Sequence, residues 1–121
     1  MRIDEESFQV VYDLETKTVS FFGSLRMNEL AEFDKIKKFM KEAYELDDLQ
    51  LMFDFKKLEF MNSAGISTLC KFIFDIKDLT PYKPVIIVGN ANILWQRKSF
   101  ENLKKIWDKL TIRFDDEKPK A

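Results

Sequence analysis

The chain contains no histidine and one cysteine, Cys70, among its 121 residues. Without an imidazole there is no base for a Ser-His or Cys-His nucleophilic pair. One cysteine and no histidine also fall short of the usual zinc ligand sets. A lone cysteine cannot form an intramolecular disulfide, and it suits a reducing compartment. Because Cys70 has apolar neighbours in a helical pattern, we interpret it as a small core residue rather than a reactive thiol.

Glycine is also scarce, and the positive and negative charges nearly balance. Three glycines leave no Gly-rich phosphate loop, and a formal net charge of −1 lacks the basic excess of nucleic-acid binders. No segment approaches the roughly 20 apolar residues of a membrane helix, and Met1–Glu6 carries acids where a signal peptide needs an apolar run. We therefore expect a cytoplasmic protein with no membrane span, no nucleic-acid partner, no metal and no cofactor. Nothing in the composition argues for an enzyme.

What the chain does contain is apolar and aromatic. Hydrophobic residues make up 45% of it, and twelve of its residues are phenylalanine. This composition is typical of a globular protein, and the length suits one hydrophobic core rather than two. We predict a single domain over residues 1–121, in which Asp115–Ala121 forms a polar, frayed tail.

Apolar β-prone runs alternate with amphipathic segments along the chain. The predicted strands are Phe8–Tyr12, Val19–Phe22, Leu49–Asp54, Val85–Val88 and Thr111–Phe114. The predicted helices are Asn28–Leu46, Ser63–Leu79 and Gln96–Lys109, and Phe55–Met61 is interpreted as a half-polar connection. The order β-β-α-β-α-β-α-β predicts an α/β domain with a mixed sheet.

Two of these strands place their following loops together. The strands that end at Asp54 and Val88 are joined through a helix, so as neighbours they are parallel with a right-handed crossover. The loops at 60–63 and 89–95 then share the carboxyl edge of the sheet. That edge is where α/β proteins usually place a working surface.

The most informative stretch is the start of the second helix. Asn62 and Ser63 stand at or next to its N-cap, where both residue types accept hydrogen bonds from free N–H groups. Gly65 is a poor helix former in the first turn, which suggests close approach by a neighbouring chain.

This stretch resembles the signature of the STAS domain, the family of bacterial anti-sigma factor antagonists and their relatives. The matching residues are Phe53-Asp54-Phe55, Glu59-Phe60-Met61 and Asn62–Ile66 with Leu69, and more weakly Val19–Leu25. The resemblance implies the same α/β architecture. It also implies a regulatory module of signal transduction that binds a serine kinase or an anti-sigma-like partner.

By this resemblance, Ser63 corresponds to the serine that a partner kinase phosphorylates. A phosphate there would meet the positive end of a helix. The simpler interpretation is that Ser63 only caps the helix. The family commonly has Asp before the serine, whereas this chain has Asn62, so phosphorylation on Ser67 or Thr68, or none at all, stays open.

The candidate partner-binding residues lie at the same edge. They are Asn62, Ser63, Ala64, Gly65, Ser67 and Trp95. Either Phe72 or Phe74, together with Trp95, is a candidate aromatic anchor, although both phenylalanines more simply wrap the edges of the core. Arg97 and Lys98 are interpreted as solvated loop charges, with a phosphate on Ser63 or an acidic partner as the alternative.

Two other functions fit the same sequence. The first is a scaffold or homodimer module that uses this edge without phosphorylation. The second is a domain that binds a small ligand, a nucleotide or a lipid, at the carboxyl edge.

Overall fold

A computed structural model describes residues 1–26, 28, 30–46 and 49–115. The strands are β1 (Arg2–Asp4), β2 (Phe8–Asp13), β3 (Thr18–Leu25), β4 (Leu51–Met61), β5 (Val85–Asn90) and β6 (Thr111–Asp115). The helices are α1 (Leu30–Leu46), α2 (Ser63–Ile76) and α3 (Leu94–Ile106). The predicted order is confirmed apart from one additional strand, β1. Its three residues contain a single buried side chain, Ile3, too short a pattern to predict a strand.

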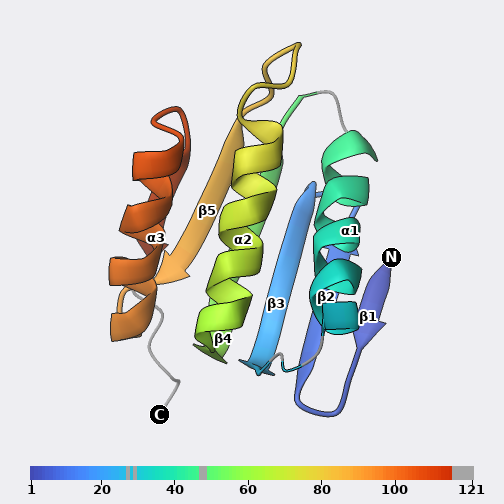
Figure 1. The fold of residues 1–121 in the computed structure, drawn as a ribbon, viewed down its shortest axis with the longest axis vertical. Coiled ribbons are helices and arrows are strands. Elements are labelled where there is room, and N and C mark those ends of the chain that lie inside the picture. The colour runs from blue at the N-terminus through green and yellow to red at the C-terminus, as the bar shows by residue number, and fades with distance from the viewer. Residues whose placement is uncertain (27, 29, 47–48, 116–121) are drawn as a thin grey trace.

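The six strands form one mixed sheet in sequence order, β1-β2-β3-β4-β5-β6. The β1–β2 and β2–β3 pairs are antiparallel, and the three pairs from β3 to β6 are parallel. Each parallel pair is connected through a helix, and every connection moves in the same direction across the sheet. Right-handed crossovers therefore place α1, α2 and α3 on one face, as Figure 1 shows. No described helix covers the opposite face.

The core lies between the sheet and the helices and is largely aromatic. The Phe21 and Phe55 rings stack with centroids 4.5 Å apart, and the Phe53 ring meets that of Phe72 edge-on at 5.4 Å. Phe100 of α3 packs against Phe55 at 4.9 Å. Such pairs contribute about 0.5–1.5 kcal/mol each beyond the area they bury. They fix α2 and α3 against the middle of the sheet.

The predicted connection at 55–61 is wrong, because β4 continues through it as a strand to Met61. Its pairing with β3 persists to Leu25–Met61 through two register shifts, whereas its pairing with β5 ends at Asp54–Val88. Polar residues are tolerated here because one face of the sheet carries no helix. The strand therefore projects beyond β5 and carries the start of α2 to the carboxyl edge.

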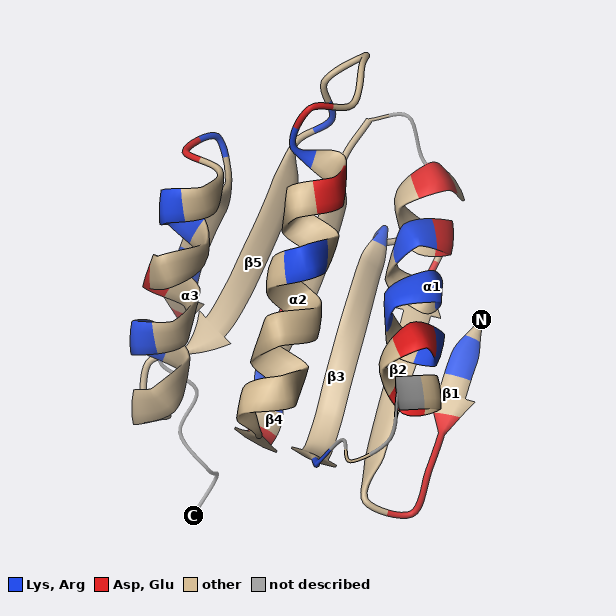
Figure 2. Ribbon diagram, in the orientation of Figure 1, with Lys and Arg blue, Asp and Glu red and all other residues tan. Residues whose placement is uncertain are grey.

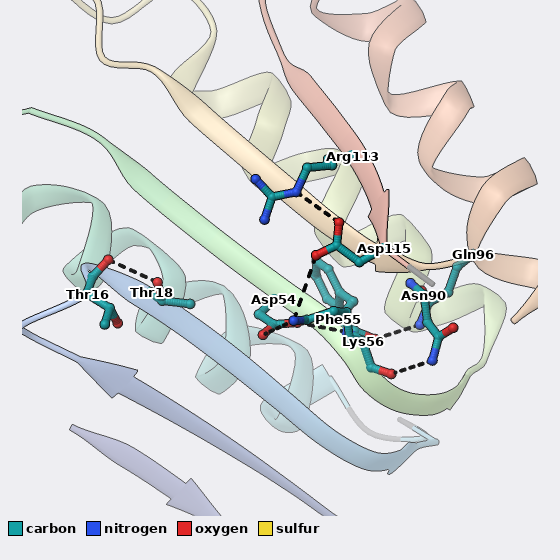
Figure 3. Close-up of polar contacts among 9 residues, drawn as sticks. All are labelled: Thr16, Thr18, Asp54, Phe55, Lys56, Asn90, Gln96, Arg113 and Asp115. Atoms are coloured by element: carbon teal, nitrogen blue, oxygen red, sulfur yellow. Dashed lines mark hydrogen bonds and ion pairs between the residues drawn. The ribbon is translucent and has the colours of Figure 1, made fainter. Parts of the chain in front are cut away.

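On the open face, ion pairs join the middle of β4 to the end of β6 (Figure 3). The Lys56 ammonium lies 3.8 Å from a carboxylate oxygen of Asp54 and 3.9 Å from one of Asp115. Arg113 contacts the other oxygen of Asp115 at 3.1 Å. Asp115, placed in the predicted tail, is thus the last residue of β6. The rest of that tail, 116–121, lies outside the described residues.

The helix boundaries differ slightly from prediction. Helix α2 begins at Ser63 as predicted and ends at Ile76, with its last backbone bond from Lys77 to the Ile73 carbonyl at 3.0 Å. Helix α3 starts two residues before the predicted Gln96, because Leu94 and Trp95 form its first turn. No described helix is long and apolar enough to span a membrane.

Candidate functional site

Asn62 determines where α2 begins. Its backbone is extended, with φ −75° and ψ 172°, and its side-chain Oδ1 accepts the N–H of Gly65 at 3.0 Å. Its carbonyl accepts the first intrahelical bond, from Ile66 at 3.1 Å. Its own N–H donates to the Leu25 carbonyl of β3 at 3.1 Å. Asn62 is therefore the N-cap, and it ties the start of the helix to the sheet.

The next two residues leave their backbone donors open. Within the described part of the chain, the N–H groups of Ser63 and Ala64 have no acceptor. The Ser63 side chain is exposed. These N–H groups carry the positive partial charge of the helix terminus. The site thus combines an accessible hydroxyl with two unused donors at the positive end of a helix.

The other two hydroxyls of this helix differ from each other. Ser67, one turn after Ser63, is exposed. Thr68 is 5% exposed, and its hydroxyl donates to the Ala64 carbonyl at 3.0 Å. The geometry therefore leaves Ser67, and not Thr68, accessible as an alternative to Ser63.

Gly65 faces inward at the same turn. It is buried and borders a cavity of about 10 Å³ enclosed by α1, α2 and the sheet. Ligand pockets are usually 300–1,000 Å³, so this cavity cannot hold a nucleotide or a lipid. No three Asp, Glu or Cys side chains of the described residues gather closely enough to hold a metal ion.

Trp95 is half-buried and already engaged. Its indole Nε1–H donates to the Glu59 carbonyl at 2.8 Å, and its ring meets Phe100 edge-on at 5.9 Å. It therefore joins the first turn of α3 to the projecting end of β4. Its neighbour Arg97 stacks over the Phe114 ring, 4.6 Å from the centroid, which directs that charge to the β6 side of α3.

Gln96 is a structural residue of the site that the sequence prediction missed. It is fully buried, and its Nε2 donates to the carbonyls of Phe55 at 2.7 Å and Leu58 at 2.9 Å. Asn90 adds a bond from its Nδ2 to the Lys56 carbonyl at 3.1 Å (Figure 3). These side-chain amides supply hydrogen-bond donors to the β4 carbonyls beyond Asp54, where β4 is no longer paired with β5. The available signal was an uncharged polar residue on the same helical stripe as Phe100.

Two exposed apolar side chains at this edge were also missed. Leu94, the first residue of α3, is 86% exposed, and Phe60 at the end of β4 is 38% exposed. The Arg26 guanidinium lies over the Phe60 ring at 4.6 Å from the centroid. Leu94 lies off the core stripe of its helix, which is the signal the sequence offered.

Charge is distributed unevenly over the three helices. Residues 63–70 of α2 contain no charged side chain, whereas α1 carries charges of both signs and α3 carries mainly positive ones (Figure 2). Burial raises the pKa of the Cys70 thiol in this segment, so the thiol stays protonated near neutral pH. The first two turns of α2 thus offer a neutral surface between two charged helices.

The phenylalanines of α2 separate into two roles. Phe72 is fully buried, as the simpler interpretation expected, whereas Phe74 is 63% exposed. The Lys77 ammonium lies 5.1 Å from the centroid of the Phe74 ring. Phe74 therefore extends the outer surface of α2 instead of wrapping the core.

No protein-family model matches the chain, and no curated protein matches its sequence. Its structure is similar to a chain in the crystal structure of diguanylate cyclase SiaD in complex with its activator SiaC from Pseudomonas aeruginosa. The TM-score is 0.70 at 11% sequence identity, and the match covers 95% of this chain and 99% of that chain. The likeness confirms the predicted STAS-like α/β fold.

Proposed function

We propose that this protein is a regulatory protein-interaction module that binds its partner through the N-terminal edge of α2, with Ser63 as a phosphorylation switch. The observation that carries the proposal is the exposed Ser63 hydroxyl beside two backbone N–H groups that lack acceptors in the described structure. A phosphate on Ser63 would bring about −1.5 to −2 charges to these donors. The fold accepts the modification because nothing buried has to move.

The structural comparison supports a regulator as the class of protein. The match covers 99% of the other chain, so that chain is a small domain of similar length. We infer that it is the activator SiaC rather than the cyclase. The partner of the present chain would then be a signalling protein. It would be a serine kinase, an anti-sigma-like protein or another signalling enzyme.

The switch would act through the cost of desolvating the phosphate at the interface. Residues 63–70 carry no charge, so a partner packed there meets a neutral surface. A phosphate would have to lose water or be left without a partner in that contact. A change of about 1.4 kcal/mol is enough for a tenfold change in affinity, and a buried phosphate exceeds it.

The test is affinity capture from the native cells with the full chain and its variants. We expect Ser63→Ala to retain the partner and Ser63→Glu to lose it, while both keep nearly the same melting temperature. Thr16→Glu is the matched control, since it adds the same charge at an exposed hydroxyl position in the β2–β3 turn. Mass spectrometry of the native protein then locates any phosphate.

Equal capture by Ser63→Ala and Ser63→Glu would contradict the switch. One observation favours a constitutive scaffold as the second candidate, because Asn62 supplies the cap without the negative charge that the family commonly places there. In that case no phosphate is found on Ser63 or Ser67, and Ser63→Ala and Ser63→Glu capture the partner equally.

A further inference from the structure

The outer side of β6 forms a groove with α3. The groove has a volume of about 510 Å³ and is lined by Arg97, Glu101, Lys104, Lys105, Ile112 and Phe114. The two apolar side chains are half-buried and form its floor, whereas the charged ones are exposed on the helix. Strand β6 is the last strand of the sheet, so no described strand pairs with its outer side.

The backbone of β6 is oriented for pairing. The Asp115 carbonyl accepts the N–H of Ala91, just past the end of β5, at 2.9 Å, so the backbone groups of Asp115 point inward. Because successive residues point to opposite sides of a strand, those of Ile112 and Phe114 point outward. The same two residues thus provide the floor of the groove and the free edge of the sheet.

We propose that this groove binds an extended acidic segment of a partner protein, which adds a seventh strand to the sheet beside β6. Main-chain hydrogen bonds to Ile112 and Phe114 would hold the segment, and alternate apolar side chains would cover the floor. The proposal does not involve Ser63 and stands apart from the function proposed above.

The charges of the groove select this occupant. It carries three positive side chains and one negative side chain, a balance that favours an acidic ligand. A second copy of the chain is a poor fit, because antiparallel pairing of two β6 strands about their middle residue places Arg113 opposite Arg113. Like charges directly opposite destabilise a strand pair. A neutral or basic segment lacks the attraction.

The experiment is selection of a phage-displayed library of random peptides on the full chain. We expect enrichment of acidic peptides with alternating apolar residues. The variant Lys104→Glu/Lys105→Glu should bind them at least about tenfold more weakly, since it replaces two charges that attract an acidic peptide with two that repel it. The variant Lys38→Glu/Lys41→Glu, with the same charge change on exposed positions of α1, should bind them like the wild type.

Amide hydrogen exchange shows where the selected peptides bind. We expect slower exchange at the amides of Ile112 and Phe114 and no change at Ile3 in β1, the strand at the other edge. Acidic peptides that bind without this protection would reveal simple charge attraction and overturn the proposal. The proposal is also overturned if no acidic peptide is enriched. Self-association of Lys104→Glu/Lys105→Glu would then show that the lysines only protect an exposed edge from pairing with other copies.

Discussion

The side-chain amide of Gln96 donates to the carbonyl of Phe55 at 2.7 Å inside the core. The same NH₂ group reaches the carbonyl of Leu58 at 2.9 Å, and the Gln96 Oε1 accepts the N–H of Asn90 at 2.7 Å. One helix side chain thereby replaces the neighbouring strand that β4 lacks beyond Asp54. Gln96 in this way sets the path along which β4 leads to the start of α2.

We predict that Gln96→Leu destabilises the protein by roughly 3 kcal/mol or more. The substitution keeps most of the volume and leaves buried backbone groups of Phe55, Leu58 and Asn90 unpaired, each at a cost of about 1–3 kcal/mol. Urea unfolding measures the loss. Asn102→Leu, at an exposed position of the same helix, is the control and should change stability little. A loss below about 1 kcal/mol for Gln96→Leu would show that water replaces the amide.

The start of α2 could be predicted from sequence because its signals are local. The cap from Asn62 spans three residues, and the helical pattern follows directly. The path of β4 could not, since 55–61 is rich in charge and those polar residues reflect a face of the sheet without helices. Parallel strands are usually covered on both faces and are therefore continuously apolar. By that criterion a segment as polar as 55–61 is predicted to be a loop.

The site was predictable in part for the same reason. The exposed position of Ser63 follows from its place in the first turn. The role of Gln96 does not, because its acceptors on Phe55 and Leu58 lie 41 and 38 residues away in sequence. Leu94 was missed because exposure of a single leucine depends on how α3 rests on the sheet. The long-range contacts determine both.

Gly89 is predicted to tolerate no larger residue. A methyl group there would lie 2.8 Å from ring carbons of Phe114 and 3.0 Å from the Gln96 Oε1. We expect Gly89→Ala to cost about 1–3 kcal/mol through overpacking, measured by urea unfolding. The control is a double-mutant cycle with Phe114→Ala, in which the penalty of Gly89→Ala shrinks. Strict additivity of the two changes would argue against the ring contact.

Asn62 is predicted to be exchangeable for Asp but not for Ala. Asn62→Ala removes the acceptor for the Gly65 N–H and should cost about 1 kcal/mol. Asn62→Asp keeps the acceptor and adds a negative charge at the helix N-terminus, which should stabilise by about 0.3–1 kcal/mol at low salt. Thermal unfolding at low and high salt separates the two effects. A salt-independent gain would mean that the helix dipole is not its cause.

Stability is predicted to fall on the alkaline side. Burial raises the pKa of Cys70 above its ordinary value of 9.0, and burial followed by repulsion from Tyr82 raises the pKa of Tyr44 above 10.0. Above pH 9.0 the unfolded chain loses the thiol proton before the folded chain does, so the free energy of unfolding decreases as pH rises. Urea unfolding across pH 8 to 11 measures it. Cys70→Ala should remove the part of the decline that begins near pH 9.0. If the variant shows the same dependence of stability on pH as the wild type, Cys70 is not its cause.

Leu94 is predicted to contribute to partner binding and not to folding. Its side chain is 86% exposed at the first position of α3, beside the turn that Trp95 fixes to β4. Leu94→Ser should therefore change the unfolding free energy by less than about 0.5 kcal/mol, as exposed substitutions do. Affinity capture with this variant should recover clearly less partner. Leu14→Ser, at a leucine 67% exposed in the β2–β3 turn, is the matched control. If both variants recover as much partner as the wild type, the partner surface does not extend from α2 to Leu94 of α3.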